Sequence, residues 1–171
     1  MRASLTAFSL LALAACASMN RSQCINADWY AIGLEDGARG RALERLGDHR
    51  RACTEYNVVP DTARYIAGRN EGLKSFCTYE RGFAEGRAGN AYVAACPAPS
   101  DAFLAAYNRG RELHDLHQRL DEVEREIAGI KSALTKGIPD PRARAEQVER
   151  LEALTRESES LQARISQAER R

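Results

Sequence analysis

Three segments of the chain repeat one pattern, in which a tyrosine is followed by glycines three and seven positions later, with an acidic residue just before the second glycine. On an α-helix, positions i, i+3 and i+7 share one face, so each copy places a tyrosine beside a strip of bare backbone. A glycine inside a helix costs ~1 kcal/mol relative to alanine. Close contact between helices can offset that cost, so the repeat predicts helices that pack through glycine faces. The motif residues are Tyr30, Gly33, Asp36 and Gly37, then Tyr65, Gly68, Glu71 and Gly72, then Tyr79, Gly82, Glu85 and Gly86.

Two interpretations of the repeat stay open at the level of sequence. In the favoured one the faces serve packing: a tyrosine ring covers the glycine strip of a neighbouring helix, and arginines pair with the motif acids. In the other, tyrosines, glycines and carboxylates line a shallow groove that holds a glycan or a peptide. Tyr107 and Gly110 begin a fourth copy, which is abandoned at His114, and Gly40 and Gly89 add a third glycine to two copies.

Capping and helix-breaking residues divide the first part of the chain into short helices. Gly47 suits the position after a helix, and the Val59-Pro60 pair ends another. No stretch alternates apolar and polar residues with a period of two, so we expect an all-α fold without a sheet. The expected helices cover residues 29–46, 48–56, 62–76 and 78–88, with a new helix after Ser100.

The last third of the chain has a different pattern, with apolar residues spaced alternately by three and four positions. Such a seam, sustained over three heptads, is typical of a coiled coil. A Gly/Pro segment around Gly137 and Pro141 then ends one helix and begins the next. Residues 112–171 are therefore predicted to form an antiparallel coiled-coil hairpin, either projecting, which we favour, or packed down on the domain of residues 29–111. The first seam is Leu113, Leu116, Leu120, Val123, Ile127, Ile130 and Leu134; the second is Leu151, Leu154, Leu161, Ile165 and Ala168, interrupted by Ser158.

Residues 1–15 have the features of a secretory signal peptide: Arg2 is followed by a short apolar run that is too short to span a membrane. The string Leu13-Ala14-Ala15-Cys16 resembles a lipobox, which implies cleavage before Cys16 and attachment of lipid there. Residues 16–28 would then be a lipidated polar tether. Since residue 17 is not acidic, we expect an outer-membrane protein, lipid-anchored and facing the periplasm.

Four cysteines remain once Cys16 is assigned to lipid: Cys24, Cys53, Cys77 and Cys96. An even number in an exported domain indicates disulfides. Three pairings are possible, and we favour Cys24–Cys53 with Cys77–Cys96, because each would link adjacent helices. The chain lacks C-x-x-C spacing, which argues against zinc.

Several of these features together resemble the DUF2799 family of bacterial envelope lipoproteins. They are the lipobox, the segment Asp28-Trp29-Tyr30 with its following glycines, the Tyr/Gly repeats, and the cysteines ahead of Cys96-Pro97. The resemblance covers roughly residues 16–115. It implies an envelope location and a helical fold but no activity, because none is assigned to the family.

Composition and motifs give little support to catalysis. Lys and Arg number 25 and Asp and Glu 24, a balance that argues against binding to nucleic acid. His114 and His117 are expected on the solvated side of a helix, and His49 is expected to be a capping or surface residue. We find no catalytic constellation and expect no metal and no cofactor.

The sequence therefore predicts a non-catalytic envelope lipoprotein that acts as a periplasmic interaction or structural module. Its expected partners are the membrane, through the lipid anchor, and a protein or the cell wall. The alternative is a peptidoglycan- or glycan-binding cell-wall enzyme or activator that uses the Tyr/Gly faces as a groove.

Overall fold

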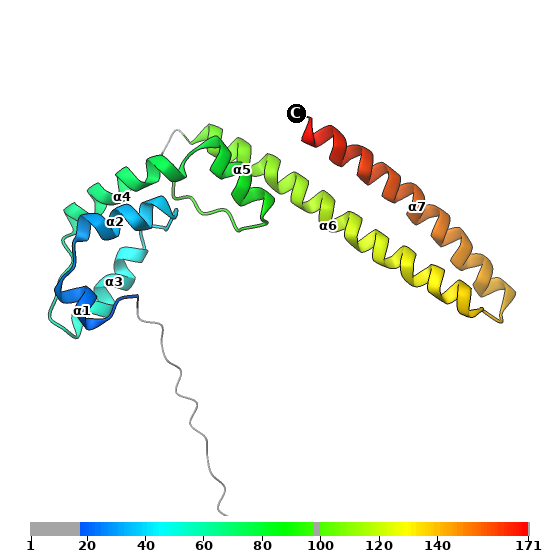
Figure 1. The fold of residues 1–171 in the computed structure, drawn as a ribbon, viewed down its shortest axis with the longest axis horizontal. Coiled ribbons are helices and arrows are strands. Elements are labelled where there is room, and N and C mark those ends of the chain that lie inside the picture. Colours follow the sequence, from blue (N-terminus) through cyan, green and yellow to red (C-terminus); the bar gives the residue numbers. More distant parts are fainter. Residues whose placement is uncertain (1–17, 98–99, 171) are drawn as a thin grey trace, which may run out of the picture.

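The computed structural model describes residues 18–97 and 100–170, and in these residues all regular structure is helical (Figure 1). Helices α1 to α4 form one end of an arch. Helix α5 and the first part of α6 form its middle, and the rest of α6 with α7 forms the other end. The helices are α1 (Arg21–Ile25), α2 (Trp29–Ala38), α3 (Arg45–Thr54), α4 (Thr62–Phe76), α5 (Tyr79–Arg87), α6 (Asp101–Lys136) and α7 (Pro141–Glu169).

Helix α2 is shorter than the sequence predicted. It ends at Ala38 rather than near residue 46, because Gly40 adopts a left-handed conformation with φ 65°. The amide of Arg41 donates to the carbonyl of Asp36 and the amide of Gly40 to that of Gly37, which is the Schellman arrangement. Gly47, expected to end this helix, instead lies inside α3. The prediction for α4, residues 62–76, agrees with the structure.

The segment expected to be a polar tether is folded. It contains α1, and the side chains of Met19 and Cys24 are 6% and 1% exposed. A disulfide joins Cys24 to Cys53 of α3, and the cluster around it includes Trp29 and Leu46. Of the predicted tether, Cys16 and residue 17 lie outside the described residues, as does the predicted signal peptide. The described chain is thus packed against the core from its first residues.

Helix α6 belongs to two helix–helix contacts. Its first part packs on α5 and its remainder on α7, without a break at residues 111–112, where the sequence analysis placed a domain boundary. The end of α7 returns to the α5 contact, where an Nη of Arg109 lies 3.4 Å from the carbonyl oxygen of Ala168. The α5–α6 contact and the α6–α7 contact are therefore joined by one continuous helix.

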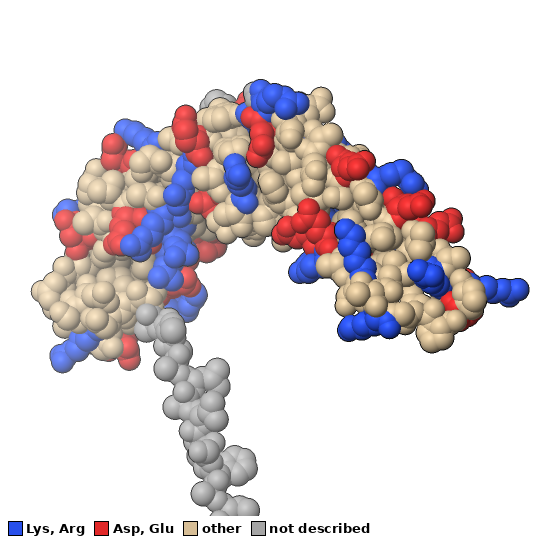
Figure 2. Space-filling model, turned by 45° about the vertical axis from the view of Figure 1, so that its right-hand side comes forward, with Lys and Arg blue, Asp and Glu red and all other residues tan. Residues whose placement is uncertain are grey.

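Helices α6 and α7 run antiparallel along an apolar seam (Figure 1). Arg119 bonds to Glu157 at 2.7 Å, and one heptad further along α6, Glu126 bonds to Arg150 at 2.9 Å. Seven residues forward on α6 thus correspond to seven residues back on α7. Outside the seam, acidic and basic side chains are interspersed (Figure 2). The buried seam residues are Leu113, Leu116, Val123 and Ile130 of α6 and Leu154, Ser158, Leu161, Ile165 and Ala168 of α7.

The structure contains both disulfides that the sequence favoured, Cys24–Cys53 and Cys77–Cys96. The first fastens α1 to α3, and the second closes the segment between α5 and α6 back onto the end of α4. Replacing either pair with serine should lower the free energy of unfolding by ~3 kcal/mol, because each bond restricts the unfolded chain. Urea unfolding followed by circular dichroism measures this change. If melts of the native protein with and without reductant coincide, the disulfides do not support the fold.

Candidate functional site: two glycine-faced helix pairs and the pocket between them

Helices α2 and α4 contact each other backbone to backbone through the motif glycines. A Cβ atom built on Gly33 would lie 2.1 Å from the carbonyl oxygen of Tyr65, and one on Gly68 would lie 2.0 Å from that of Tyr30. Real Cβ contacts essentially never fall under 3.0 Å, so only glycine fits at these positions. The reciprocal contact repeats one turn later, between Gly37 and Arg69 and between Gly72 and Leu34. Because both helices advance in the same direction, the pair is parallel.

Helices α5 and α6 form a second parallel pair in the same way. The Cβ positions of Gly82 and Gly86 would lie 2.4 and 2.0 Å from the carbonyl oxygens of Phe103 and Tyr107. A Cβ built on Gly110 would lie 2.2 Å from the carbonyl oxygen of Phe83.

The fourth copy of the motif lies four residues earlier than the sequence analysis placed it. In the register of these contacts, Phe103 corresponds to the motif tyrosine, and Gly110 is the second small residue rather than the first. Ala106, which is fully buried, holds the position of the first glycine. Tyr107, expected to begin the copy, is an interior position of it.

The first helix of each pair ends in the same way. Gly40 and Gly89 have φ of 65° and 74°, and a Cβ on either would strike an aromatic ring of the second helix, Phe76 or His114. One residue later, the carbonyl of Arg41 accepts hydrogen bonds from the guanidinium of Arg69, and that of Asn90 accepts one from the hydroxyl of Tyr107. The same unit is therefore built twice. His114 and His117, expected on the solvated side, are both half-buried.

The tyrosines do not cover the glycine strips, as the packing interpretation had supposed. Carbonyl groups occupy that space, which is why the helices come so close. Tyr65 is fully buried and Tyr107 nearly so, whereas Tyr30 and Tyr79 on the first helices are 38% and 43% exposed. The glycine faces are closed on one another, so a groove along them is absent from the described part of the chain.

Asp36, the motif acid of α2, is buried and joins three elements of the fold. Its Oδ2 accepts a hydrogen bond from the hydroxyl of Tyr65 at 2.8 Å and lies 2.8 Å from Nε2 of His49, whose Nδ1 lies 3.0 Å from Oγ of Ser18. An ionised carboxylate only accepts, so Nε2 of His49 donates to Asp36. His49, expected at the surface, is 4% exposed. The arginine partner that the sequence suggested for Asp36 is replaced by this histidine.

The pKa of the Asp36 carboxyl is below its usual value. Burial raises this pKa, but the hydrogen bonds from His49 and Tyr65, together with the electrostatic effects of His49 and Arg45, outweigh it. Burial and the bond to Asp36 raise the pKa of the Tyr65 hydroxyl, so it remains a donor at neutral pH. The order Ser–His–Asp is also that of hydrolytic triads. Here, however, the carboxylate holds Tyr65 as well, and the chain of bonds ties α2, α3, α4 and the first described residue together. We interpret this chain of hydrogen bonds as a structural feature that holds these elements together.

The other motif acids have local partners. Glu71 pairs with Lys74 at 2.6 Å, and Glu85 pairs with Arg81 at 3.0 Å, which is a pairing of a motif acid with an arginine as the sequence suggested.

The family model described as "Protein of unknown function (DUF2799)" matches residues 28–112. The chain belongs to this family. The match begins at the N-cap of α2 and ends inside α6, so the DUF2799 region contains both glycine-faced pairs and leaves out α7. No curated protein and no solved structure matches the chain.

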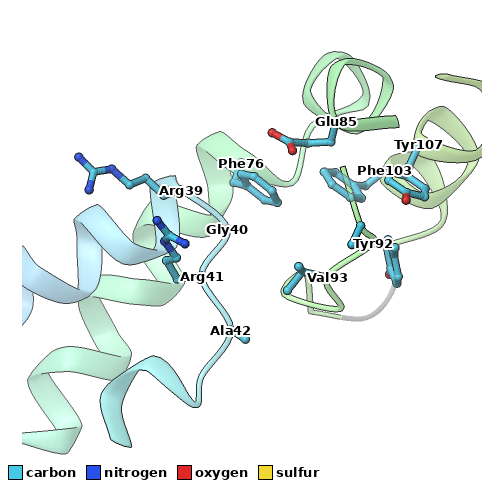
Figure 3. A pocket seen from close by; sticks show the side chains of 11 residues that line it. Arg39, Gly40, Arg41, Ala42, Phe76, Glu85, Tyr92, Val93, Phe103 and Tyr107 are labelled. Carbon is cyan, nitrogen blue, oxygen red and sulfur yellow. The ribbon is translucent and has the colours of Figure 1, made fainter. Parts of the chain in front are cut away.

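A pocket of about 310 Å³ lies between the two pairs of the DUF2799 region (Figure 3). The rings of Phe76 and Phe103, 5.4 Å apart between centroids, form its aromatic wall. Arg41 lies on the side of the loop between α2 and α3, and Tyr92 and Val93 lie opposite, on the loop between α5 and α6. Nothing in the sequence analysis assigned this pocket, since its walls come from segments that are far apart in the chain.

Two features are absent from the part of the DUF2799 chain that the structure describes. No helix there is long and apolar enough to cross a membrane. No group of three or more His, Cys, Asp or Glu side chains is arranged to hold a metal ion, counting only residues whose positions are described.

Replacing Gly72 or Gly86 with alanine should lower the free energy of unfolding by ~1–3 kcal/mol or more, because the added methyl overlaps a backbone carbonyl that cannot move alone. Gly129 of α6 is the matched control, since nothing beyond the neighbouring backbone of its own helix lies within 4 Å of its Cβ position. There, alanine should raise stability by roughly 0.5–1 kcal/mol. Urea unfolding of the three variants tests this, and equal effects at all three positions would refute the backbone contact.

Asp36→Asn should lower the free energy of unfolding at pH 7 by ~1–3 kcal/mol, because the buried partners lose an ionised acceptor. A carboxyl whose pKa is lowered in the folded state stabilises the fold above its unfolded pKa of ~3.9 and loses that contribution as pH falls through the folded value. The difference between the native protein and the variant should therefore shrink below about pH 4. Urea titrations across pH 2–7 measure it, and a constant difference would contradict the assignment.

Proposed function

We propose that this chain is a non-catalytic lipoprotein of the cell envelope, anchored through Cys16 in the outer membrane and facing the periplasm as an interaction module. The observation that carries the proposal is the fixed start of the fold. Ser18 bonds to buried His49 at 3.0 Å, and Met19 is 6% exposed, so the core begins two residues after the proposed lipid site.

Such an arrangement suits a domain that stands directly on a bilayer. Two residues span at most ~7 Å, so a lipid on Cys16 would hold α1 and α3 at the membrane surface without a flexible tether. A loose tether would let the domain tumble, whereas this short link restricts its orientation.

The long helices supply the interacting arm in this proposal. We infer that α6 and α7 form an antiparallel coiled-coil hairpin, supported by the heptad spacing, the buried seam and the two ion pairs one heptad apart. From Leu113 to Lys136 the arm extends about 36 Å at 1.5 Å per residue. Since α6 also forms half of the second glycine-faced pair, the arm leaves the domain at a fixed angle and presents its tip to a protein partner or the cell wall.

A second candidate function is the binding of cell-wall glycan, and the pocket between the two pairs favours it. The closed glycine faces offer no groove for a glycan, so this function depends on Phe76, Phe103, Tyr92 and Arg41 instead.

Cell fractionation combined with mass spectrometry tests the main proposal. The native protein should be found in the outer-membrane fraction, with a chain that begins at Cys16 and carries added acyl mass, and Cys16→Ser should lack that mass. Purified peptidoglycan incubated with the protein should release no soluble fragments. Recovery of the native protein without lipid refutes the anchor, and release of fragments refutes the non-catalytic assignment.

A further inference from the structure

We propose that the pocket between the two glycine-faced pairs binds a saccharide unit that carries a carboxylate, which deepens the proposed envelope function by naming a ligand class. The first support is the size and the composition of the pocket. A volume of about 310 Å³ lies at the lower end of the range for small-molecule sites, which fits one sugar ring with its substituents.

The aromatic residues provide the surface that a sugar ring needs. The carbon–hydrogen face of a pyranose is apolar and packs on the flat face of an aromatic side chain, while the hydroxyls at its edge stay hydrated or bond to polar groups. Phe76 and Phe103 are buried and held against each other, but Tyr92 is 40% exposed and lies at the open side, with its ring 5.3 Å from that of Tyr107. We therefore propose that the ring of Tyr92 packs against the carbon–hydrogen face of the sugar.

The charges of the pocket select a carboxylate. Glu85 is already held by Arg81 at 3.0 Å and by the amide of Asn90 at 2.6 Å. Arg39 pairs with Glu35 at 2.7 Å, and both Arg39 and Arg41 lie on the side of the pocket opposite Tyr92 (Figure 3). Arg41 is exposed and has no ion-pair partner among residues 18–97 and 100–170. Its guanidinium can form two parallel hydrogen bonds to a carboxylate, the geometry that arginine favours.

The two loops that line the pocket are held in place by contacts within the protein, without a ligand. The loop that carries Arg41 is held by the left-handed Gly40 and by the two bonds from Arg69 to the carbonyl of Arg41. The opposite loop is held by the bond from Tyr107 to Asn90 and by the Cys77–Cys96 disulfide. A preformed site loses little conformational entropy on binding, so even a small ligand can be retained.

A pair of matched sugars tests this proposal. N-acetylmuramic acid differs from N-acetylglucosamine by a lactyl group that ends in a carboxylate. Saturation-transfer NMR on the detergent-solubilised full chain should detect binding of the first sugar and at least about tenfold weaker binding of the second, because a charge-assisted hydrogen bond is lost. Binding in vitro does not depend on the lipid anchor, so failure here is distinct from failure of the proposed location.

Substitutions of two residues that line the pocket test whether the sugar binds there. Arg41→Gln should weaken binding of N-acetylmuramic acid by about tenfold and leave the weak binding of N-acetylglucosamine unchanged. Tyr92→Ala should weaken both. Arg125→Gln is the control, since Arg125 is an exposed arginine on α6 that takes no part in the pocket, and it should bind like the native protein. Circular dichroism melts confirm that each variant is folded. Absence of binding, equal binding of the two sugars, or equal loss in Arg41→Gln and Arg125→Gln would overturn the proposal.

Discussion

The reciprocal contact between backbone carbonyls and glycine Cα atoms determines the shape of the DUF2799 region. Each of its two helix pairs brings the carbonyl of one helix into the space that a Cβ would fill on the other, at four positions in the first pair. Cα–H···O contacts of this kind are individually weak, of the order of 0.5–1 kcal/mol, but the pairing repeats them along the face. The close approach also leaves little room for long side chains between the helices. Stability must then come from the clusters beside the pairs, where the disulfides and the Asp36–His49–Tyr65 bonds lie.

The sequence was sufficient to predict the glycine faces, because their spacing matches the period of a helix, and the seams of α6 and α7 follow from heptad spacing in the same way. It was not sufficient to say what covers the glycines, since a tyrosine ring and a neighbouring backbone need the same empty strip. The end of α2 was missed because both Gly40 and Gly47 are acceptable stops, and only the ring of Phe76 against Gly40 decides between them.

Other errors arose because residues distant in sequence meet in the fold. Asp36 and His49 come from different helices, and no local pattern relates them. The fourth motif copy was misplaced because Ala106 and Phe103 stand where glycine and tyrosine were sought. One signal for the folded start was present: a disulfide requires Cα atoms within about 7 Å, so a bonded Cys24 had to bring its segment against another helix. That argument excludes a free tether at residue 24.

Helix α6 takes part in two contacts that differ in how much rotation of the helix they tolerate. Its first part packs on α5 with backbone against backbone, and its remainder packs on α7 through apolar side chains. Because α6 is one continuous helix, a rotation about its own axis would affect both contacts. Side chains in the seam can adjust to a small rotation, but the carbonyl of Tyr107 against Gly86 cannot. The first part of α6 therefore tolerates less rotation than the part that packs on α7.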